Sequence, residues 1–336
     1  MLGEYYKLLI FPHPLSFDYT YNTFPEVGWT NWKVLLSLAA SIGLIILTIR
    51  GLRSKNIFSF AILFFAITFA ITSNIFLLIG ATFAERFMFV PLLGFCLAVS
   101  VLLGKFLDIE KKNPPNTFLA VIGVILLLYS FKTISRNQVW ESDETLFTTG
   151  IETAPNSCRT QSFYGVMHYR KAQKTQDPNL QKSYLETSVE YLKKSINTFP
   201  RFVETYQHLA LTYEALNQNQ LAFETYQKAI DIDPTYFPAF TNYGVLSYKN
   251  QNYDQALQYL NQAVQLAPKN AVINRGLGLT YRAKNQLDLA AQYIKEALAV
   301  QYTEANLSSL VEIYRTKGEI ETAIAYDKEI KRLRGE

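Results

Sequence analysis

The residues most able to do chemistry lie beside apolar segments of the chain. Glu85 and Arg86 are adjacent in AERFMFVP, at the start of an apolar run, and His13 and Asp18 lie in FPHPLSFDYT. A carboxylate can act as a general base, and a cationic side chain beside it can hold a phosphate. The alternative for the Glu85–Arg86 pair is an anchor for a helix end at the membrane surface. We take Asp18 and Glu85 as candidate catalytic bases, and Arg86 and His13 as candidate phosphate contacts.

Other kinds of site find little support in the sequence. The chain has only three histidines, and none has a partner at metal-ligand spacing, so we expect no metal site and no resident cofactor. We expect His168 and His208 to be surface or packing residues. The two cysteines, Cys96 and Cys158, lie in an apolar and a polar part of the chain, and we expect no disulfide between them. A net charge of only +4, without a run of Lys or Arg, argues against nucleic acid as a partner.

Four apolar segments precede the polar part of the chain. They cover residues 32–49, 57–80, 87–104 and 115–131. Crossing a membrane as a helix takes about 20 apolar residues, so each segment is a candidate span. For the last segment a buried core helix is the alternative. We predict about four transmembrane helices within residues 32–131.

Basic residues in short loops predict the orientation of these spans, because such loops remain in the cytoplasm. The loop between the second and third spans carries only Arg86, beside Glu85. Residues 1–31, which form an outer-face segment, and everything after the fourth span are then expected outside the cytoplasm, in a periplasm or lumen. The other two loops hold the remaining basic residues: Arg50, Arg53, Lys55, Lys105, Lys111 and Lys112.

The polar part of the chain repeats a helix-pair pattern about every 34 residues, the period of tetratricopeptide (TPR) repeats. Small residues let paired helices approach, and several pairs must stack to bury their apolar faces. We expect a linker and half a repeat over residues 132–157 and a TPR domain over residues 158–336, with residues 172–182 inserted in the first pair. The predicted fold class is therefore all-α, with transmembrane helices followed by a TPR α-solenoid. The clearest repeat has Tyr206, Leu209, Ala210, Tyr213, Ala222, Tyr226, Ala229 and Pro234.

The concave groove of such a solenoid is predicted to bind a protein or peptide. Arg275 and Arg282 lie seven residues apart on one helix face, so both can meet a carboxylate. The alternative is that these positions form an ordinary solvated face. The polar or charged positions that we predict to face the groove are Gln207, Glu214, Thr241, Tyr248, Arg275 and Arg282.

Three blocks of the sequence together resemble a known family. They are GEYYKLLIFPHPLSFDYTYN, AERFMFVPLLGFCL and RNQVWESDETLFTTGIETAPNSCRTQSFYGV. In this order they resemble the C-terminal half of the transmembrane-and-TPR O-mannosyltransferases, of the C-type glycosyltransferase superfamily. The resemblance implies a polyprenyl-phosphate sugar donor and a site outside the cytoplasm, with Arg86 contacting the lipid phosphate. It also implies that residues 11–25 lie on the membrane surface beside that site, after an amphipathic helix that contains Tyr5 and Leu9.

The sequence departs from this family in one respect. Its members carry their key acidic residues in the first outer loop, and no paired acidic motif precedes residue 32 here. We therefore expect a C-terminal fragment, a split subunit with a separate catalytic half, or a mis-started product, and the sequence leaves enzymatic activity undecided. Three functions remain open: a membrane-anchored TPR module that binds protein partners, an O-glycosyltransferase active by itself with Asp18 or Glu85 as base, and an envelope assembly scaffold.

Overall fold

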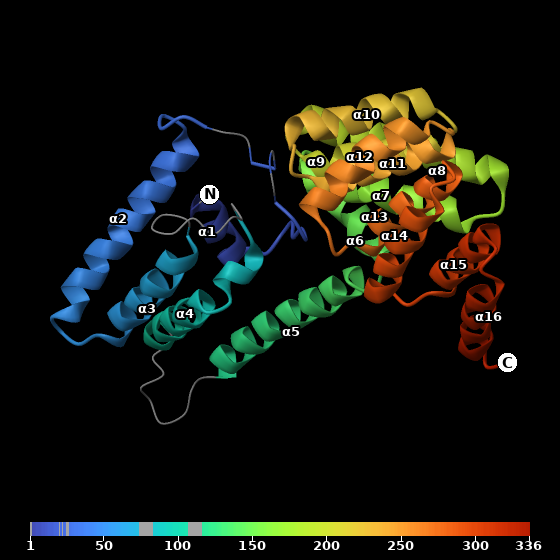
Figure 1. Ribbon diagram of the computed structural model, residues 1–336. Helices are drawn as coiled ribbons and strands as arrows, with labels where there is room; N and C mark the ends of the chain where they lie inside the picture. Colours follow the sequence, from blue (N-terminus) through green and yellow to red (C-terminus); the bar gives the residue numbers. More distant parts are fainter. Residues whose placement is uncertain (1, 20, 22, 25–26, 74–82, 107–115) are drawn as a thin grey trace. The chain divides into compact units, whose positions relative to one another are not determined.

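The computed structural model describes residues 2–19, 21, 23–24, 27–73, 83–106 and 116–336. Throughout these residues the regular structure is helical, with sixteen α-helices, one 3₁₀ helix and no strand (Figure 1). The chain forms two compact units, and the division between them falls inside one helix, after Met167. The first unit also includes residues 197–199.

The first unit contains the apolar helices and the beginning of the polar part. Asparagine side chains cap the N-termini of its second and third helices, where Asn31 and Asn56 each accept a backbone N–H two residues further on. A cluster of mainly aromatic residues holds the short first helix, whose Tyr5 stacks on Phe83. The helices are α1 (Leu2–Ile10), α2 (Trp32–Leu52), α3 (Ile57–Thr72), η1 (Glu85–Met88), α4 (Pro91–Phe106), α5 (Asn116–Val139), α6 (Asp143–Thr153) and the start of α7 (Cys158–Lys174).

Among the residues that the structure describes, two helices are long and apolar enough to cross a membrane, namely Trp32–Leu52 and the Leu119–Val139 part of α5. No part of the Leu119–Val139 segment is buried in the protein. This segment is therefore not a buried core helix, which was the alternative to a membrane span. The predicted count of four spans is not confirmed. Helix α3 has 16 residues, which rise about 24 Å, less than the hydrocarbon core of about 30 Å. Helix α4 is equally short, and residues 74–82, part of the predicted second span, lie outside the described residues.

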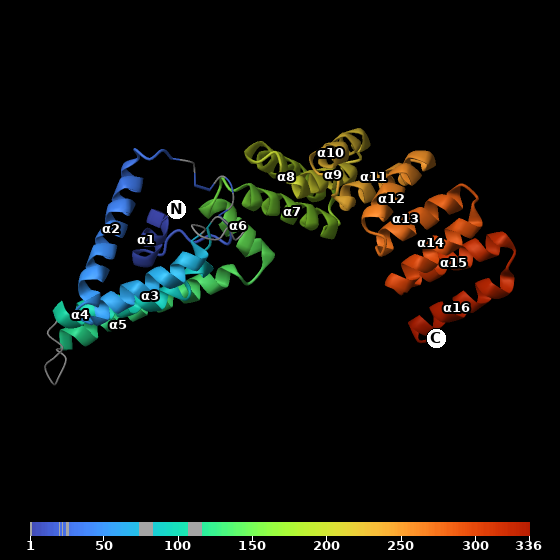
Figure 2. The same ribbon diagram turned by 60° about the vertical axis from the view of Figure 1, so that its left-hand side comes forward.

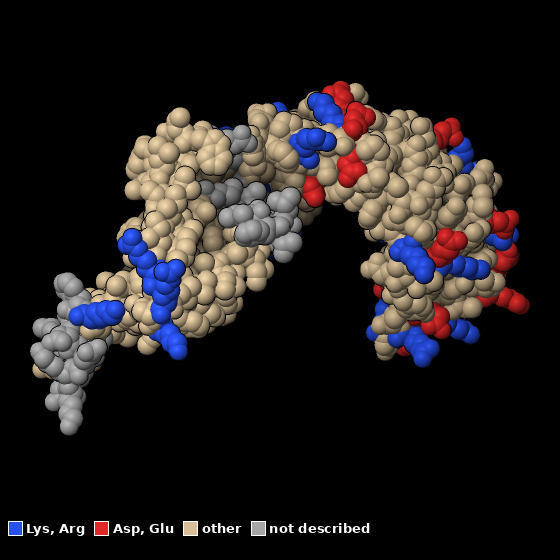
Figure 3. All heavy atoms as spheres, turned by 90° about the vertical axis from the view of Figure 1, so that its left-hand side faces the viewer, with Lys and Arg blue, Asp and Glu red and all other residues tan. Residues whose placement is uncertain are grey.

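Basic side chains gather at one end of these apolar helices. Arg50 lies in the last turn of α2, Arg53 and Lys55 follow it, and Lys105 lies in the last turn of α4. Figure 3 shows this basic end with no acidic side chain beside it on the face in view. The predicted Lys111 and Lys112 lie outside the described residues.

The second unit is a stack of antiparallel helix pairs. Each pair packs on the next along the chain, from α9 to α16 (Figure 2). At Gly244 and Gly278 an added Cβ would lie 2.6 Å from a side-chain carbon of the partner helix, so any larger residue there would force the partner side chain or helix to shift. The helices are the end of α7, α8 (Pro178–Thr198), α9 (Val203–Ala215), α10 (Asn219–Ile232), α11 (Phe237–Lys249), α12 (Tyr253–Leu266), α13 (Ala271–Ala283), α14 (Leu287–Val300), α15 (Glu304–Lys317) and α16 (Ile320–Arg334).

The predicted insertion at residues 172–182 is mostly helical. Helix α7 continues to Lys174 and α8 begins at Pro178, so the extra residues lengthen both helices instead of forming a loop. Asp177 begins α8 by accepting the backbone N–H of Asn179 at 2.9 Å. The two helices have 17 and 21 residues, against 13 and 14 in the next pair.

Candidate functional site

Glu85 begins the 3₁₀ helix η1 and binds the loop that precedes α2. Its Oε1 accepts the hydroxyl of Tyr19 at 2.5 Å and the backbone N–H of Ser16 at 3.0 Å. The Tyr19 hydroxyl also lies 2.8 Å from the Ser16 nitrogen, and both loop residues are buried. One carboxylate oxygen thereby fixes the turn between Ser16 and Tyr19.

The charges around Glu85 come from α5. Burial raises the pKa of the Glu85 carboxyl, whereas the Tyr19 hydrogen bond and the charges of Arg136 and Lys132 act to lower it. Burial, and after it the neighbouring Glu85, raises the pKa of the Tyr19 phenol. The Nζ of Lys132 also lies 3.3 Å from Nδ1 of His13. A carboxylate and two cations therefore lie close to this loop. Neither cation was predicted from the sequence as a site residue.

Asp18, the other candidate base, has different partners. Its Oδ2 accepts the Ser157 hydroxyl at 3.0 Å, and its Oδ1 lies 3.5 Å from an Arg159 nitrogen. Ser157 precedes α7 and Arg159 lies in its first turn. Asp18 therefore joins the loop to the start of α7.

Aromatic packing reinforces this attachment. The ring of Phe17 lies 5.5 Å from that of Phe147 and 6.0 Å from that of Phe163, between centroids. Gly150 makes room for it, because a Cβ there would lie 2.2 Å from the Phe17 ring. The Cys158 N–H donates to the Tyr21 carbonyl at 2.8 Å. Residues before α2 and residues after α5 thus touch, so both lie on one side of any membrane that the intervening helices cross.

The structure brings three of the four predicted residues to this loop and leaves the side chain of the fourth exposed. His13 and Asp18 lie in the loop itself, and Glu85 binds it. Arg86 is exposed, with its guanidinium 5.5 Å from the centre of the Phe87 ring. The predicted surface helix exists as α1, but its Tyr5 and Leu9 are buried in the protein's own aromatic cluster. Among the described residues, no group of three or more His, Cys, Asp or Glu could hold a metal ion.

The predicted groove positions on α9 and α11 mostly have partners within the solenoid. Gln207 accepts a hydrogen bond from the Tyr236 hydroxyl. Glu214 accepts one from Tyr226 at 2.6 Å and forms an ion pair with Lys249 at 3.1 Å. A cavity of about 380 Å³ lies beside Glu214 and Lys249.

The two remaining positions on α11 differ in exposure. Thr241 is buried, and its hydroxyl donates to the Phe237 carbonyl at 2.8 Å. Tyr248 is half-buried, with its ring 5.9 Å from that of Tyr253. Tyr248 is therefore more available to a partner than Thr241.

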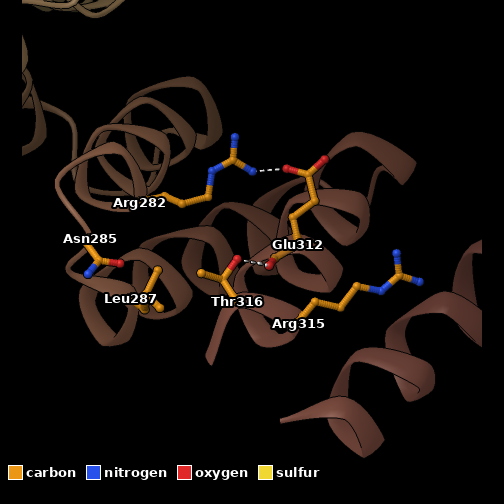
Figure 4. A pocket seen from close by; sticks show the side chains of 6 residues that line it. All are labelled: Arg282, Asn285, Leu287, Glu312, Arg315 and Thr316. Atoms are coloured by element: carbon orange, nitrogen blue, oxygen red, sulfur yellow. Dashed lines mark hydrogen bonds and ion pairs between the residues drawn. The ribbon is translucent and has the colours of Figure 1, made fainter. Parts of the chain in front are cut away.

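The arginines on α13 differ from each other. Arg275 is exposed and makes no ion pair with any residue that the structure describes. Arg282 forms an ion pair with Glu312 of α15. A cavity of about 470 Å³ lies beside that pair (Figure 4). The seven-residue spacing predicted that Arg275 and Arg282 share a helix face. It did not predict the ion pair between Arg282 and Glu312.

The fold and the matched sequence families define the class of protein. Tetratricopeptide repeat family models match residues 203–236, 225–258 and 244–306. This part of the chain is therefore an array of TPR repeats, a module that generally mediates protein–protein interaction.

The relatives support the resemblance predicted above, because the chain is similar to curated protein O-mannosyl-transferases. It is 25% identical to TMTC3 of Mus musculus over 324 residues, covering 89% of this chain and 33% of that protein. It is 27% identical to TMTC1 of Mus musculus over 187 residues, covering 50% of this chain and 20% of that protein. For tmtc2 of Xenopus laevis the identity is 30% over 103 residues, or 30% of this chain and 12% of that protein. The chain thus spans one third or less of each of these relatives.

Solved structures also resemble about half of the chain. MamA of Desulfovibrio magneticus matches with a TM-score of 0.43 and 21% identity, over 51% of this chain and 95% of its own. The pilF protein of Pseudomonas aeruginosa matches with a TM-score of 0.44 and 20% identity, over 51% of this chain and 77% of its own.

Proposed function

We propose that this chain is the repeat-bearing part of a membrane-bound protein O-mannosyltransferase that uses a polyprenyl-phosphate sugar. In this proposal the solenoid lies outside the cytoplasm and binds acceptor proteins or other protein partners. A separate part of the enzyme carries the acidic catalytic residues. The observation that carries the proposal is the similarity to TMTC3, because it extends over 89% of the chain and so includes both the apolar helices and the repeats.

Two features of the first unit support this arrangement in the membrane. Arg50, Arg53 and Lys55 lie together between α2 and α3, and loops rich in such residues remain in the cytoplasm. The loop before α2 touches α7 through Asp18 and Arg159, so the start of the solenoid lies on the same side as that loop. Together they favour a solenoid on the non-cytoplasmic side, whether the helices cross two or four times.

Photocrosslinking from the groove tests the proposal. A photoreactive residue replaces Val245, which lies about one helical turn from the predicted groove positions Thr241 and Tyr248 on α11, in the full chain in native membranes. The matched control places the same group at exposed Glu224 on α10. We expect Val245 to capture proteins that carry O-linked mannose, detected by mass spectrometry, and Glu224 to capture none. The same proteins from both positions, or captured proteins without mannose, would contradict the proposal.

A second candidate function is sugar transfer by this chain alone, with Glu85 as the base and Arg86 on the donor phosphate. The observation favouring it is that Glu85, a partly buried carboxylate whose pKa is raised by burial, lies next to the exposed cation Arg86 in η1. Purified chain with a polyprenyl-phosphate sugar and an acceptor peptide would then form glycopeptide. Glu85→Gln would abolish product, whereas Tyr19→Phe, which keeps the carboxylate, would retain it. An absence of product with folded chain removes this candidate.

A further inference from the structure

The basic end of the apolar helices carries positive charges that no carboxylate of these helices balances (Figure 3). Its four cations are exposed, and none of them forms an ion pair with a residue that the structure describes. The sequence has no Asp or Glu at residues 27–84 or 86–107, so α2, α3 and α4 cannot supply one. Residues 107–115 carry two acidic and two basic side chains, so they leave this excess of charge unchanged. The four cations are Arg50, Arg53, Lys55 and Lys105.

The fold brings cations from two separate segments to this end, because α3 packs on both α2 and α4. Near the start of α3, the Ser59 hydroxyl donates to the Leu47 carbonyl of α2 at 3.3 Å. At its other end, the Thr72 hydroxyl donates to the Phe87 carbonyl, before α4, at 3.3 Å. Helix α4 therefore runs antiparallel to α3, and Lys105 in its last turn lies on the side where α3 begins.

The helix dipole does not explain all of these cations. Arg50 and Lys105 lie in the last turns of α2 and α4, where positive charge stabilises a helix. Lys55, however, directly precedes the N-cap of α3, where the dipole disfavours a cation. It also has a φ of 52°, in the left-handed region that glycine and asparagine usually occupy. A ligand for the positive charge would account for a lysine at this position.

The basic end lies at the level of the lipid phosphates if α2 crosses a membrane. Residues 32–50 rise about 27 Å, close to the hydrocarbon thickness of about 30 Å. Exposed apolar side chains lie beside the cations on all three helices. They include Ile49 and Leu52 on α2, Ile57 on α3 and Leu102 on α4. A phospholipid has the same two parts, a charged headgroup and apolar chains.

We propose that the basic end binds an anionic phospholipid, whose phosphate contacts the cations while its acyl chains lie along the exposed apolar side chains. Clusters of Lys and Arg beside transmembrane helices attract anionic lipids, and an arginine can bind a phosphate through two parallel hydrogen bonds. One headgroup then joins the α2–α3 turn to the end of α4. A zwitterionic lipid binds less tightly, because its headgroup brings a cation of its own. Neither the sugar nor the acceptor protein enters this inference, so it does not depend on the proposed function.

Native mass spectrometry of the full chain tests the proposal. The purified chain in detergent is titrated with phosphatidylglycerol or with phosphatidylcholine of the same acyl chains, and the lipid-bound fraction gives Kd. The variants are Arg53→Gln and Lys105→Gln, singly and together, and Arg53→Lys, which keeps the charge. The matched control is Lys33→Gln, which removes an exposed cation at the opposite end of α2.

We expect the natural chain to bind phosphatidylglycerol about ten-fold or more tightly than phosphatidylcholine, and each single Gln variant to weaken phosphatidylglycerol binding about five-fold. The double variant should lose less than the product of the two single losses, because both cations contact the same lipid. Arg53→Lys and Lys33→Gln should retain the affinity of the natural chain.

Equal affinity of the natural chain for the two lipids would overturn the proposal, and this comparison decides the matter even if a Gln variant fails to fold by circular dichroism. An equal loss in Lys33→Gln and Arg53→Gln would also overturn it, because it would indicate a diffuse attraction to the whole chain. Losses that multiply in the double variant would show that no single headgroup joins the two segments. Displacement by inorganic phosphate, beyond that by chloride at the same ionic strength, would assign the basic end to a free anion.

Discussion

At the scale of single residues, Glu85 is the carboxylate that organises the loop before α2. It accepts hydrogen bonds from Tyr19 and from the Ser16 backbone while Arg136 and Lys132 supply positive charge nearby. A partly buried carboxylate without such partners would be costly, so these contacts account for its presence there. The turn between Ser16 and Tyr19 therefore depends on one acceptor atom.

Removing the Tyr19 hydroxyl tests this dependence. Tyr19→Phe leaves the ring in its aromatic cluster but deprives Glu85 of its shortest hydrogen bond. We expect a loss of about 1 to 3 kcal/mol in the free energy of unfolding of the first unit. Thermal unfolding in detergent measures it, with Tyr21→Phe, at an exposed side chain, as the control. Equal stability of the two variants would contradict the role given to Glu85.

The burial of His208 predicts that the stability of the solenoid depends on pH. Burial lowers the pKa of His208 below its ordinary value of 6.5, and the charge of Arg170 acts in the same direction. The folded state therefore holds the neutral imidazole, and its contribution to stability is complete above pH 6.5 and lost as the pH falls below it. We expect the temperature midpoint of unfolding, measured by circular dichroism, to decrease when the pH is lowered from 7 to 5. The decrease should be smaller in His208→Gln than in the natural chain. Identical pH dependence in both proteins would refute this.

The candidate residues could be chosen from the sequence only by type and neighbourhood. Glu85 and Asp18 were found because they are rare charges beside apolar runs. Lys132 and Arg136 were missed because the fourth apolar segment was predicted to end at residue 131, whereas α5 continues to Val139. No local pattern connects a residue on α5 with one on η1, since only the folded chain brings them together.

At the scale of elements, the repeat period was the most informative signal. It predicted the helix pairs from α9 to α16 because small residues recur where partner helices touch. It failed at α7 and α8, where the chain keeps the pair but lengthens both helices, so the spacing no longer matches about 34 residues. The first unit was harder to predict, since apolar composition identifies helices but not which of them are long enough to span.

Gly278 provides a test of this packing. A Cβ there would lie 2.6 Å from Ile294 Cγ1, and Ile294 is fully buried. We expect Gly278→Ala to cost about 1 to 3 kcal/mol through overpacking, although alanine favours helices more than glycine does. Chemical denaturation measures the change. Gly123→Ala, a helical position with nothing within 4 Å of the new Cβ, should lose no stability. If Gly278→Ala lost no stability, the prediction would be wrong, because α13 and α14 would then be able to move apart.

At the scale of the whole molecule, the proposal depends on where the solenoid lies. The contacts of Phe17 with Phe147 of α6 and of Asp18 with Arg159 of α7 require an even number of membrane crossings between residues 18 and 147. That parity does not itself choose a side, which depends on the basic residues around Arg53. A donor lipid and acceptor proteins outside the cytoplasm both require the solenoid to be there.

Labelling of single cysteines in intact cells is the most direct test of this arrangement. In a chain with Cys96→Ser and Cys158→Ser, a new cysteine replaces exposed Thr30, Arg53 or Lys269. A maleimide that cannot cross membranes is added outside. For a solenoid in a periplasm, we predict that Thr30→Cys and Lys269→Cys react in intact cells, whereas Arg53→Cys reacts only after lysis. Reaction of Arg53→Cys in intact cells, with Lys269→Cys protected until lysis, would contradict it.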